Sequence, residues 1–232
     1  MFAFSIWDNK KQELLLARDP FGIKPFYYAK IDKTFLFGSE IKSFIPHPDF
    51  VKEINKEALK PYLVFQYSVL KETFFKNVFK LEPGHYLKYK DGNIEIKPYY
   101  EVKFDSKEKT FEAYMKDIQE TIEESVKYHK ISDVKVGSFL SSGIDSSYIT
   151  RCLMPDKTFS VGFENKGFSE VDAASNLSKL LNIENINKII TASEFFEVLP
   201  NVQYHSDEPH ANLSAVPLYF LSELARKHVT VV

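Results

Sequence analysis

The sequence predicts an α+β fold in the first part of the chain, followed by an α/β fold with a parallel sheet. Short alternating apolar and polar runs, joined by turns such as Asp91-Gly92, predict antiparallel hairpins up to about residue 98. Beyond residue 110, strand-like and helix-like segments alternate, which is typical of parallel strands joined by crossover helices. The polar stretch Asp105–Thr110 separates the two patterns. We therefore place the domain boundary there, with domains at 1–104 and 105–232.

The first domain is predicted to consist of strand pairs and two short helices. Gly38–Phe44 predicts a helix capped by Ser39, and Asn55–Leu63 predicts another capped by Asn55. Arg18–Pro25 is a connection fixed by two prolines and a glycine. The predicted strands are Phe2–Asp8, Gln12–Arg18, Phe26–Lys30, Thr34–Phe37, Phe74–Leu81, His85–Lys90 and Asn93–Pro98.

The second domain is predicted to begin with a packing helix, Phe111–Tyr128, whose apolar residues recur at helical spacing. Val134–Val136 is expected to be a strand, Ser138–Ser147 a loop, and Tyr148–Leu153 a helix. In the helix from Phe168 to Leu181, Ser169 is the expected cap, and Leu177, Leu180 and Leu181 are expected on the apolar side. The remaining predicted strands are Thr158–Phe163, Ile186–Thr191 and His228–Val232. The remaining predicted helices are Ser193–Tyr204, interrupted near Pro200, and one that follows the stretch Asn212–Pro217 and runs through Lys227.

Composition excludes several classes of partner. The net charge of -2 gives no reason to expect nucleic acid or an anionic membrane as partner. The single cysteine, Cys152, cannot form an internal disulfide, which fits a cytoplasmic protein. The first residues do not form a signal peptide, and no apolar run is long enough to cross a bilayer. The sequence leaves open whether the chain forms a homodimer.

The loop Ser138–Ser147 has the features of a phosphate site. In a strand-to-helix loop of this kind, several backbone N–H groups point toward one place, which lies at the positive end of the helix. The N–H donors and the positive helix end both favour the binding of a phosphate. Its serine hydroxyls add donors, and Asp145 is placed to hold a magnesium ion that bridges phosphate oxygens. The loop matches neither the Walker A nor the dinucleotide pattern. An ordinary Ser/Gly-rich turn is the alternative.

This loop resembles the pyrophosphate loop, Ser-Gly-Gly-x-Asp-Ser, of the ATP pyrophosphatase superfamily of adenine nucleotide α-hydrolase-like folds. One departure is Ser142, which stands where the usual motif has its second glycine. A serine keeps the turn if its φ is negative. The resemblance implies ATP as a bound nucleotide and Mg²⁺ on Asp145. The implied phosphate-binding residues are Ser141, Ser142, Gly143, Asp145, Ser146 and Ser147.

The first domain resembles the later half of a glutamine amidotransferase domain of the N-terminal-nucleophile type. The stretches Phe2–Phe4, Arg18–Pro25, Ser39–Lys42 and Pro83–His85 are similar to motifs of glutamine-hydrolysing asparagine synthetase. The implied fold is the C-terminal half of a layered αββα domain followed by a partial doubly wound parallel-sheet ATP pyrophosphatase domain. Both ends of the family pattern are expected to be missing. The family's first-residue cysteine has no counterpart here, so we expect no glutamine hydrolysis by this chain alone.

The same resemblance implies further site residues, each with a structural alternative. Leu140 and Val161 correspond to positions that frame the adenosine, or they are plain core, and Gly162 allows a close approach to the backbone. Asp207 is the candidate for a catalytic metal or substrate contact, or it belongs to a capping turn. Glu170 aligns with an acidic position near the nucleotide, although its place in a first helical turn favours a helix-dipole role. His205 and His210 flank Asp207 without a ligand set for zinc.

The implied function is ATP-dependent asparagine synthesis from aspartate, with glutamine as the source of ammonia. The implied route runs through β-aspartyl-AMP and releases AMP and pyrophosphate. One alternative is a related amide synthetase for another carboxylate, in a β-lactam or surface-polysaccharide pathway. Another is a truncated chain that at most binds nucleotide or a partner.

Overall fold

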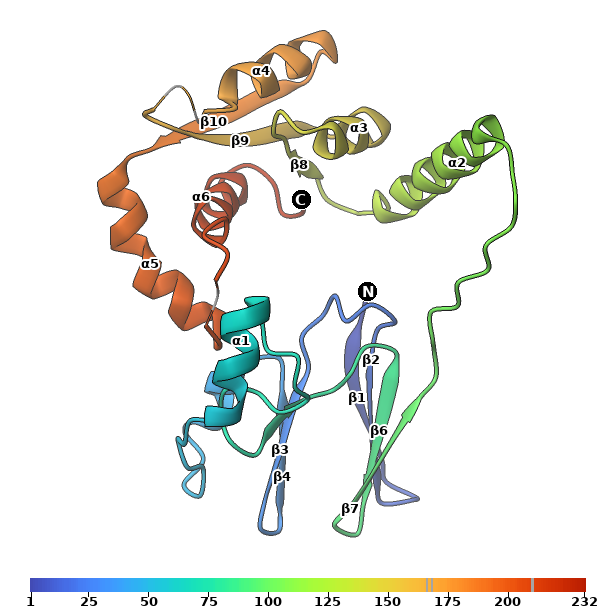
Figure 1. The fold of residues 1–232 in the computed structure, drawn as a ribbon, viewed down its shortest axis with the longest axis vertical. Coiled ribbons are helices and arrows are strands. Elements are labelled where there is room, and N and C mark those ends of the chain that lie inside the picture. Colours follow the sequence, from blue (N-terminus) through green and yellow to red (C-terminus); the bar gives the residue numbers. More distant parts are fainter. Residues whose placement is uncertain (166, 168, 210) are drawn as a thin grey trace. The chain divides into compact units, whose positions relative to one another are not determined.

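The computed structural model describes residues 1–165, 167, 169–209 and 211–232 (Figure 1). The chain divides into two compact units. Unit 1 comprises Met1–Asp105 and Gln203–Asn212, and unit 2 comprises Ser106–Val202 and Leu213–Val232. The domain boundary at 104/105 stays a prediction, and unit 1 also includes Gln203–Asn212 from the second part of the chain. The predicted helix start at Phe168 and the histidine at position 210 lie outside the described residues.

Unit 1 contains two antiparallel sheets (Figure 1). The four-stranded sheet has the order β1-β2-β6-β7, and the three-stranded sheet has the order β4-β3-β5. The predicted hairpins are confirmed. The bounds are β1 Ala3–Asp8, β2 Glu13–Arg18, β3 Tyr27–Ile31, β4 Thr34–Gly38, β5 Val78–Lys80, β6 His85–Lys90 and β7 Asn93–Pro98.

The turn between β6 and β7 shows why its sequence forms a hairpin. Asp91 and Gly92 both have left-handed backbone, with φ of 50° and 79°. Two successive positive φ values match the right-handed twist of the flanking strands, and Asp-Gly is a preferred pair for such a turn. The pairing of Lys90 with Asn93 sets the register of the whole hairpin.

The connection after β2 is held by a buried charge, Asp19, and a half-buried one, Arg18. The carboxylate of Asp19 is 1% exposed. It accepts hydrogen bonds from the backbone N–H groups of the turn that follows, those of Phe21 at 3.1 Å, Ile23 at 3.0 Å and Lys24 at 2.9 Å. Burial raises the pKa of Asp19, but the backbone donors outweigh burial and lower the pKa to about 2. The Arg18 guanidinium donates to the carbonyls of Gly22, Lys24 and Leu81 at 2.7–2.8 Å.

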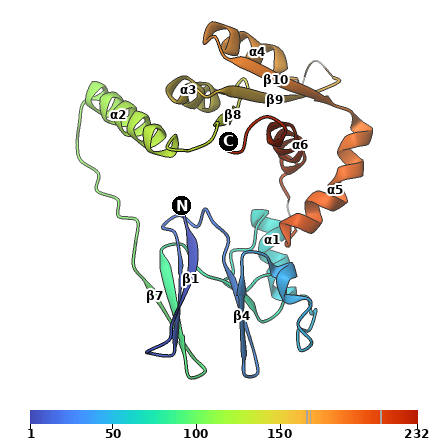
Figure 2. The ribbon, with the colours of Figure 1, turned by 180° about the vertical axis from the view of Figure 1, so that it is seen from behind.

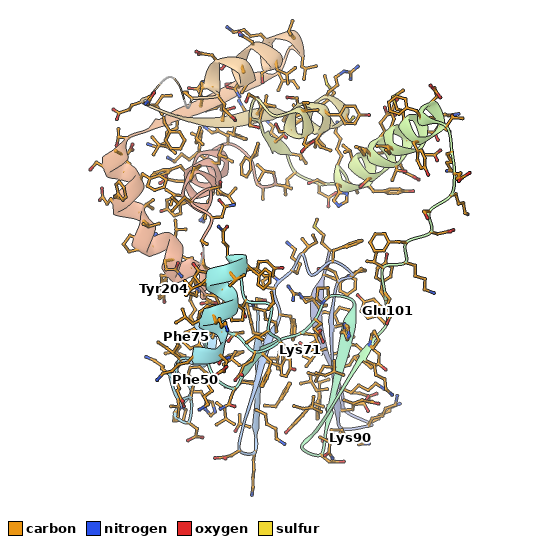
Figure 3. All side chains as sticks on the ribbon, viewed as in Figure 1. Phe50, Lys71, Phe75, Lys90, Glu101 and Tyr204 are labelled. Atoms are coloured by element: carbon orange, nitrogen blue, oxygen red, sulfur yellow. The ribbon has the colours of Figure 1, made fainter. Side chains whose placement is uncertain are left out.

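Short helices complete unit 1: η1 Ile41–Phe44, η2 Lys56–Ala58 and α1 Leu59–Phe65. The predicted Asn55 cap is confirmed, since its side chain accepts a hydrogen bond from the backbone N–H of Glu57 at 3.1 Å. The predicted Ser39 cap is wrong, because η1 begins after Glu40 and has no cap from its own N-terminal side chains. Beside these helices, the rings of Phe50 and Phe75 lie 6.4 Å apart (Figure 3).

Unit 2 is built on a parallel sheet of order β10-β9-β8 (Figure 2). Parallel pairing of consecutive strands through helical crossovers confirms the α/β prediction. Its core contains Phe159, Ile190, Val216 and Phe220. The bounds are α2 Phe111–His129, β8 Gly137–Phe139, α3 Ile144–Leu153, β9 Lys157–Phe163, α4 Val171–Leu180, β10 Glu184–Ile190, α5 Ala192–Ser206 and α6 Ala215–Arg226. The last residues of α5 belong to unit 1.

Several predicted boundaries of unit 2 are wrong. The strand before the loop is Gly137–Phe139 rather than Val134–Val136, and α3 begins at Ile144 rather than Tyr148. Lack of space explains why position 137 is a glycine, since an added Cβ would lie 2.6 Å from the Phe159 ring. The predicted terminal strand is reduced to one parallel bridge between Val136 and Val231.

The packing of two helices of unit 2 differs from the packing predicted from the sequence. In α4, the buried residues are Val171, Ala174 and Ser178, whereas Leu180 is 84% exposed. Small residues face the sheet because the helix lies close to it, with the Ser178 hydroxyl 2.8 Å from that of Thr158. In α2, the predicted helix is confirmed but its packing is not, because Val126 is its single buried residue. In the described part of the chain, no helix combines the length and apolarity needed to span a membrane.

Candidate functional site

A cavity of about 470 Å³ opens in unit 2 where β8 and β9 end. Ligand sites in proteins typically measure about 300–1,000 Å³, and in open α/β sheets they lie outside the carboxyl ends of the strands. The cavity combines an apolar wall with hydroxyls and one carboxylate. It is lined by Phe139, Leu140, Ser141, Ser146, Val161, Phe163, Glu170, Ser214, Pro217, Leu218 and Leu221.

The loop between β8 and α3 supplies the polar rim of this cavity. The hydroxyls of Ser141 and Ser146 are 2.8 Å apart, and the backbone N–H of Gly143 donates to Ser141 Oγ at 3.1 Å. Ser147 Oγ donates to the Gly143 carbonyl at 2.7 Å. Gly143 is the N-cap residue of α3 and no side chain caps that end. The loop therefore places several hydroxyls at the positive end of a helix, where an anion is stabilised.

Ser142 occupies its place in the loop without backbone strain. It is not among the residues with left-handed backbone. This meets the condition set from the sequence, that a serine can replace the usual glycine if its φ is negative. The substitution therefore leaves the turn intact.

Asp145 lies in the first turn of α3 and is exposed. Magnesium in nucleotide sites is commonly held by one or two carboxylates together with phosphate oxygens and water. Within residues 1–165, 167, 169–209 and 211–232, no group of three or more His, Cys, Asp or Glu side chains is arranged to hold a metal. The donor set at this loop therefore fits a metal that arrives with phosphate.

Glu170 turns toward the loop. It is the N-cap residue of α4, yet its side chain makes no capping hydrogen bond. Its Oε2 instead accepts a hydrogen bond from the backbone N–H of Ser142 at 3.3 Å. The sequence favoured a helix-dipole role for this residue, but the structure gives its carboxylate a contact with the loop.

Three other predicted residues lie at the strand ends. Leu140 is 4% exposed and lines the cavity together with Val161. Gly162 lies within β9, where an added Cβ would be 2.3 Å from Ser169 Oγ and 2.7 Å from Val171 Cγ2. The atoms that closely approach the backbone of Gly162 therefore belong to Ser169 and Val171 of the same chain, at the start of α4.

Asp207 belongs to unit 1, and its carboxylate contacts two other residues of that unit, Ile41 and Lys42. Its carboxylate accepts hydrogen bonds from the backbone N–H groups of Ile41 at 2.7 Å and Lys42 at 3.3 Å. The Lys42 ammonium lies 2.9 Å from the same carboxylate. A metal or substrate contact of Asp207 stays a prediction, and the hydrogen bonds of its carboxylate are made with the start of η1.

The wall contributed by α6 was not predicted. Ser214, Pro217, Leu218 and Leu221 line the cavity, but they lie far along the chain from the loop. No local pattern identifies which side chains of this wall face the cavity.

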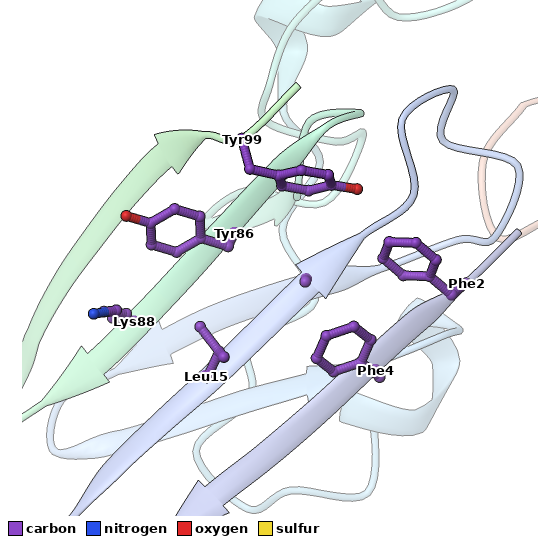
Figure 4. A pocket seen from close by; sticks show the side chains of 7 residues that line it. Phe2, Phe4, Leu15, Tyr86, Lys88 and Tyr99 are labelled. Carbon is purple, nitrogen blue, oxygen red and sulfur yellow. The ribbon is translucent and has the colours of Figure 1, made fainter. Parts of the chain in front are cut away.

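Unit 1 has a cavity of its own, of about 410 Å³, on one face of β1, β2 and β6 (Figure 4). Its lining carries one charged group, Lys88. The lining residues are Phe2, Phe4, Leu15, Ala17, Tyr86, Lys88 and Tyr99. Aromatic and apolar side chains make up most of this lining.

Comparison with known proteins assigns both parts of the chain. Residues 1–100 match a glutamine amidotransferase domain, and residues 117–232 match asparagine synthase. The chain belongs to the asparagine synthase family. The loop, its serines and Asp145 thus lie in the part of the chain that matches the synthase domain.

Curated members of the asparagine synthase family match over the whole chain. "Asparagine synthetase [glutamine-hydrolyzing] 1" of Bacillus subtilis is 45% identical over 236 residues, which cover 37% of that protein. A putative glutamine-hydrolysing asparagine synthetase of Mycobacterium tuberculosis H37Rv is 37% identical over 37% of its length. One from Methanocaldococcus jannaschii is 32% identical over 47% of its length. The chain therefore spans less than half the length of these relatives.

Proposed function

We propose that this chain carries the ATP site and part of the amidotransferase domain of a glutamine-dependent asparagine synthetase. The observation that carries the proposal is the cavity of unit 2, with the Ser141–Ser147 loop on its rim. Membership of the asparagine synthase family supports it. In this proposal, unit 2 is part of a doubly wound ATP pyrophosphatase domain, and unit 1 is the later half of a layered αββα domain.

ATP is proposed to bind with its phosphates on the loop and its adenosine against the apolar wall. The hydroxyls of Ser141, Ser146 and Ser147, together with the loop N–H groups, are donors for phosphate oxygens. Leu140 and Val161 provide the apolar surface for the base. Asp145 would hold Mg²⁺ together with phosphate oxygens, and the ion would neutralise charge on the leaving pyrophosphate.

The proposed reaction has two steps. An oxygen of the aspartate side-chain carboxylate attacks the α-phosphorus, and the bond from that phosphorus to the bridging oxygen breaks, releasing pyrophosphate. Ammonia from glutamine then attacks the carboxyl carbon of β-aspartyl-AMP, loses a proton, and displaces AMP to leave the amide. Adenylation is needed because a free carboxylate has no good leaving group. The loop contributes by stabilising the charge on pyrophosphate as it departs.

The test is isothermal titration of the chain with ATP and Mg²⁺, beside the variant Asp145→Ala. We expect the parent to bind with a dissociation constant in the millimolar range or tighter. Removing the carboxylate should weaken binding by roughly tenfold or more, because a charge-assisted metal contact is lost. The matched control is Asp172→Ala, since Asp172 is an exposed carboxylate in the first turn of α4. Equal binding by parent and Asp145→Ala would remove Asp145 from the proposed role.

A further inference from the structure

The turn after α5 carries a carboxylate at a position where glycine is the easier residue. The helix ends at Ser206, and Asp207 follows with φ of 60°, in the left-handed region. Helices often end with one such residue, and it is usually glycine because a side chain is disfavoured there. Aspartate tolerates this backbone better than most residues. The contacts of the Asp207 side chain show what it does at this position.

Both oxygens of the Asp207 carboxylate have partners in unit 1. Oδ2 accepts from the backbone N–H of Ile41 at 2.7 Å, and Oδ1 accepts from that of Lys42 at 3.3 Å. Lys42 also places its ammonium 2.9 Å from Oδ1. These are the N–H groups at the start of η1, which has no cap from Glu40. Asp207 thus supplies, from a remote part of the chain, the acceptor that this helix start lacks.

Glu208 repeats the arrangement at a second place. Its Oε1 accepts from the backbone N–H of Phe74 at 3.1 Å, and its Oε2 lies 2.6 Å from the Lys80 ammonium. The Asp207 and Glu208 side chains are 6% and 12% exposed. Nearby, the Lys42 ammonium lies 5.4 Å from the ring centre of Tyr204, which Figure 3 labels near the end of α5. Of these adjacent carboxylates, Asp207 therefore receives two backbone N–H groups and one lysine, and Glu208 receives one of each.

These contacts leave little room for a cation. A metal on Asp207 would lie beside the Lys42 ammonium, and like charges at such a distance repel strongly when partly buried. A metal or substrate there would also have to displace two backbone donors, which would leave buried N–H groups without an acceptor. The surroundings of Asp207 are those of an intramolecular contact.

We propose that Asp207 and Glu208 are positioning residues that anchor the segment Gln203–Asn212 to unit 1, with Lys42 and Lys80 as their partners. The anchored segment leads along the chain into α6, whose Ser214 and Leu218 line the cavity described above. The anchor itself does not depend on nucleotide.

The first test is amide hydrogen exchange in the full chain, resolved by residue. In Asp207→Ala, the amides of Ile41 and Lys42 lose their acceptor, and we expect them to exchange roughly tenfold faster or more. In Glu208→Ala the same is expected for Phe74. Asp207→Asn keeps one acceptor oxygen and should recover part of the protection. The matched control is Asp32→Ala, because Asp32 has the same left-handed backbone, φ of 48°, in an exposed hairpin turn.

The second test is a double-mutant cycle, which decides the question should Asp207→Ala fail to fold. Lys42→Met leaves the Asp207 carboxylate without its ammonium, and Asp207→Asn leaves the Lys42 ammonium with Glu40 alone, 3.1 Å away, so each should lower the melting temperature. In the double variant neither charge remains, and the loss should be smaller than the sum of the two single losses. Additive losses would overturn the proposal. So would unchanged exchange at Ile41 and Lys42 in a folded Asp207→Ala, or Mg²⁺ alone slowing exchange at these amides in the parent and not in Asp207→Asn.

Discussion

The carboxylate of Glu170 accepts a hydrogen bond from the backbone N–H of Ser142 at 3.3 Å. A donor of the loop thus faces a negatively charged side chain of the same protein. A phosphate group that approached this N–H would meet the carboxylate as a competitor and a like charge. Glu170 is therefore placed to oppose anion binding at one point of the loop.

We expect Glu170→Gln to bind pyrophosphate more tightly than the parent in the absence of magnesium. Removal of one like charge at close range should raise the affinity by about three- to tenfold. The measurement is a calorimetric titration with pyrophosphate, with and without Mg²⁺. The control is Asp172→Asn, which removes a charge from the first turn of the same helix.

Two outcomes of that titration would count against the competitor role. Unchanged binding without magnesium would mean that the carboxylate does not oppose the anion. Weaker binding that appears only with magnesium present would instead make Glu170 a partner of the metal.

Asp19 gives unit 1 a defined dependence on pH. Its pKa is lowered from 3.8 to about 2 in the folded chain, since the backbone donors outweigh burial. Between these values the unfolded chain binds more protons than the folded chain, so the stability from Asp19 is present above about pH 4 and is lost as the pH falls toward 2. Urea unfolding at a series of pH values measures this loss.

The variant Asp19→Asn should be less stable than the parent at neutral pH and should lack this part of the acid dependence. An amide can accept some of the backbone hydrogen bonds but carries no charge. Asp32→Asn, in an exposed turn, serves as the control. Identical slopes for the parent and Asp19→Asn between pH 4 and 2 would contradict the assignment.

Gly162 should resist the addition of a single carbon atom. In Gly162→Ala the new Cβ would lie 2.3 Å from Ser169 Oγ and 2.7 Å from Val171 Cγ2, so the start of α4 must move. We expect the free energy of unfolding to fall by about 1–3 kcal/mol, the usual cost of overpacking. Urea denaturation monitored by circular dichroism gives the value.

A second substitution checks the cause. Ser169→Ala removes the nearest atom, so the variant with both changes should regain part of the loss. If Gly162→Ala is as stable as the parent, or if Ser169→Ala brings no recovery, the close contact at this glycine does not affect the free energy of unfolding.

The sequence predicts those elements whose causes are local. The Asp91-Gly92 hairpin and the Asn55 cap depend on residues within a few positions of one another, and both are present. The parallel β-strands of unit 2 follow from the alternation of strand and helix signals.

The errors have non-local causes. Gly137 and Ser138 have weak strand propensity, but they are buried and pair with β9 in the same sheet. The helix start at Ile41 was assigned to Ser39, whereas its acceptor is Asp207. No pattern within a window of neighbouring residues contains that pairing.

The residues of the candidate site also divide into those identified by a local pattern and those brought there by the fold. Ser141 and Ser146 were identified because loop residues that bind phosphate are close in sequence. Leu218 was missed because the fold, and no local motif, brings it to the cavity. Glu170 was named, but the role favoured from sequence did not include its contact with Ser142.

The division of unit 1 into two stretches of chain has a consequence for biosynthesis. Residues 203–212 are added about 100 residues after Asp105, which at ~5–20 residues per second is a delay of about 5–20 s. Until they emerge from the ribosome, Asp207 cannot accept hydrogen bonds from the amides of Ile41 and Lys42 or pair with the Lys42 ammonium. Unit 1 is therefore completed only after most of unit 2 has been synthesised.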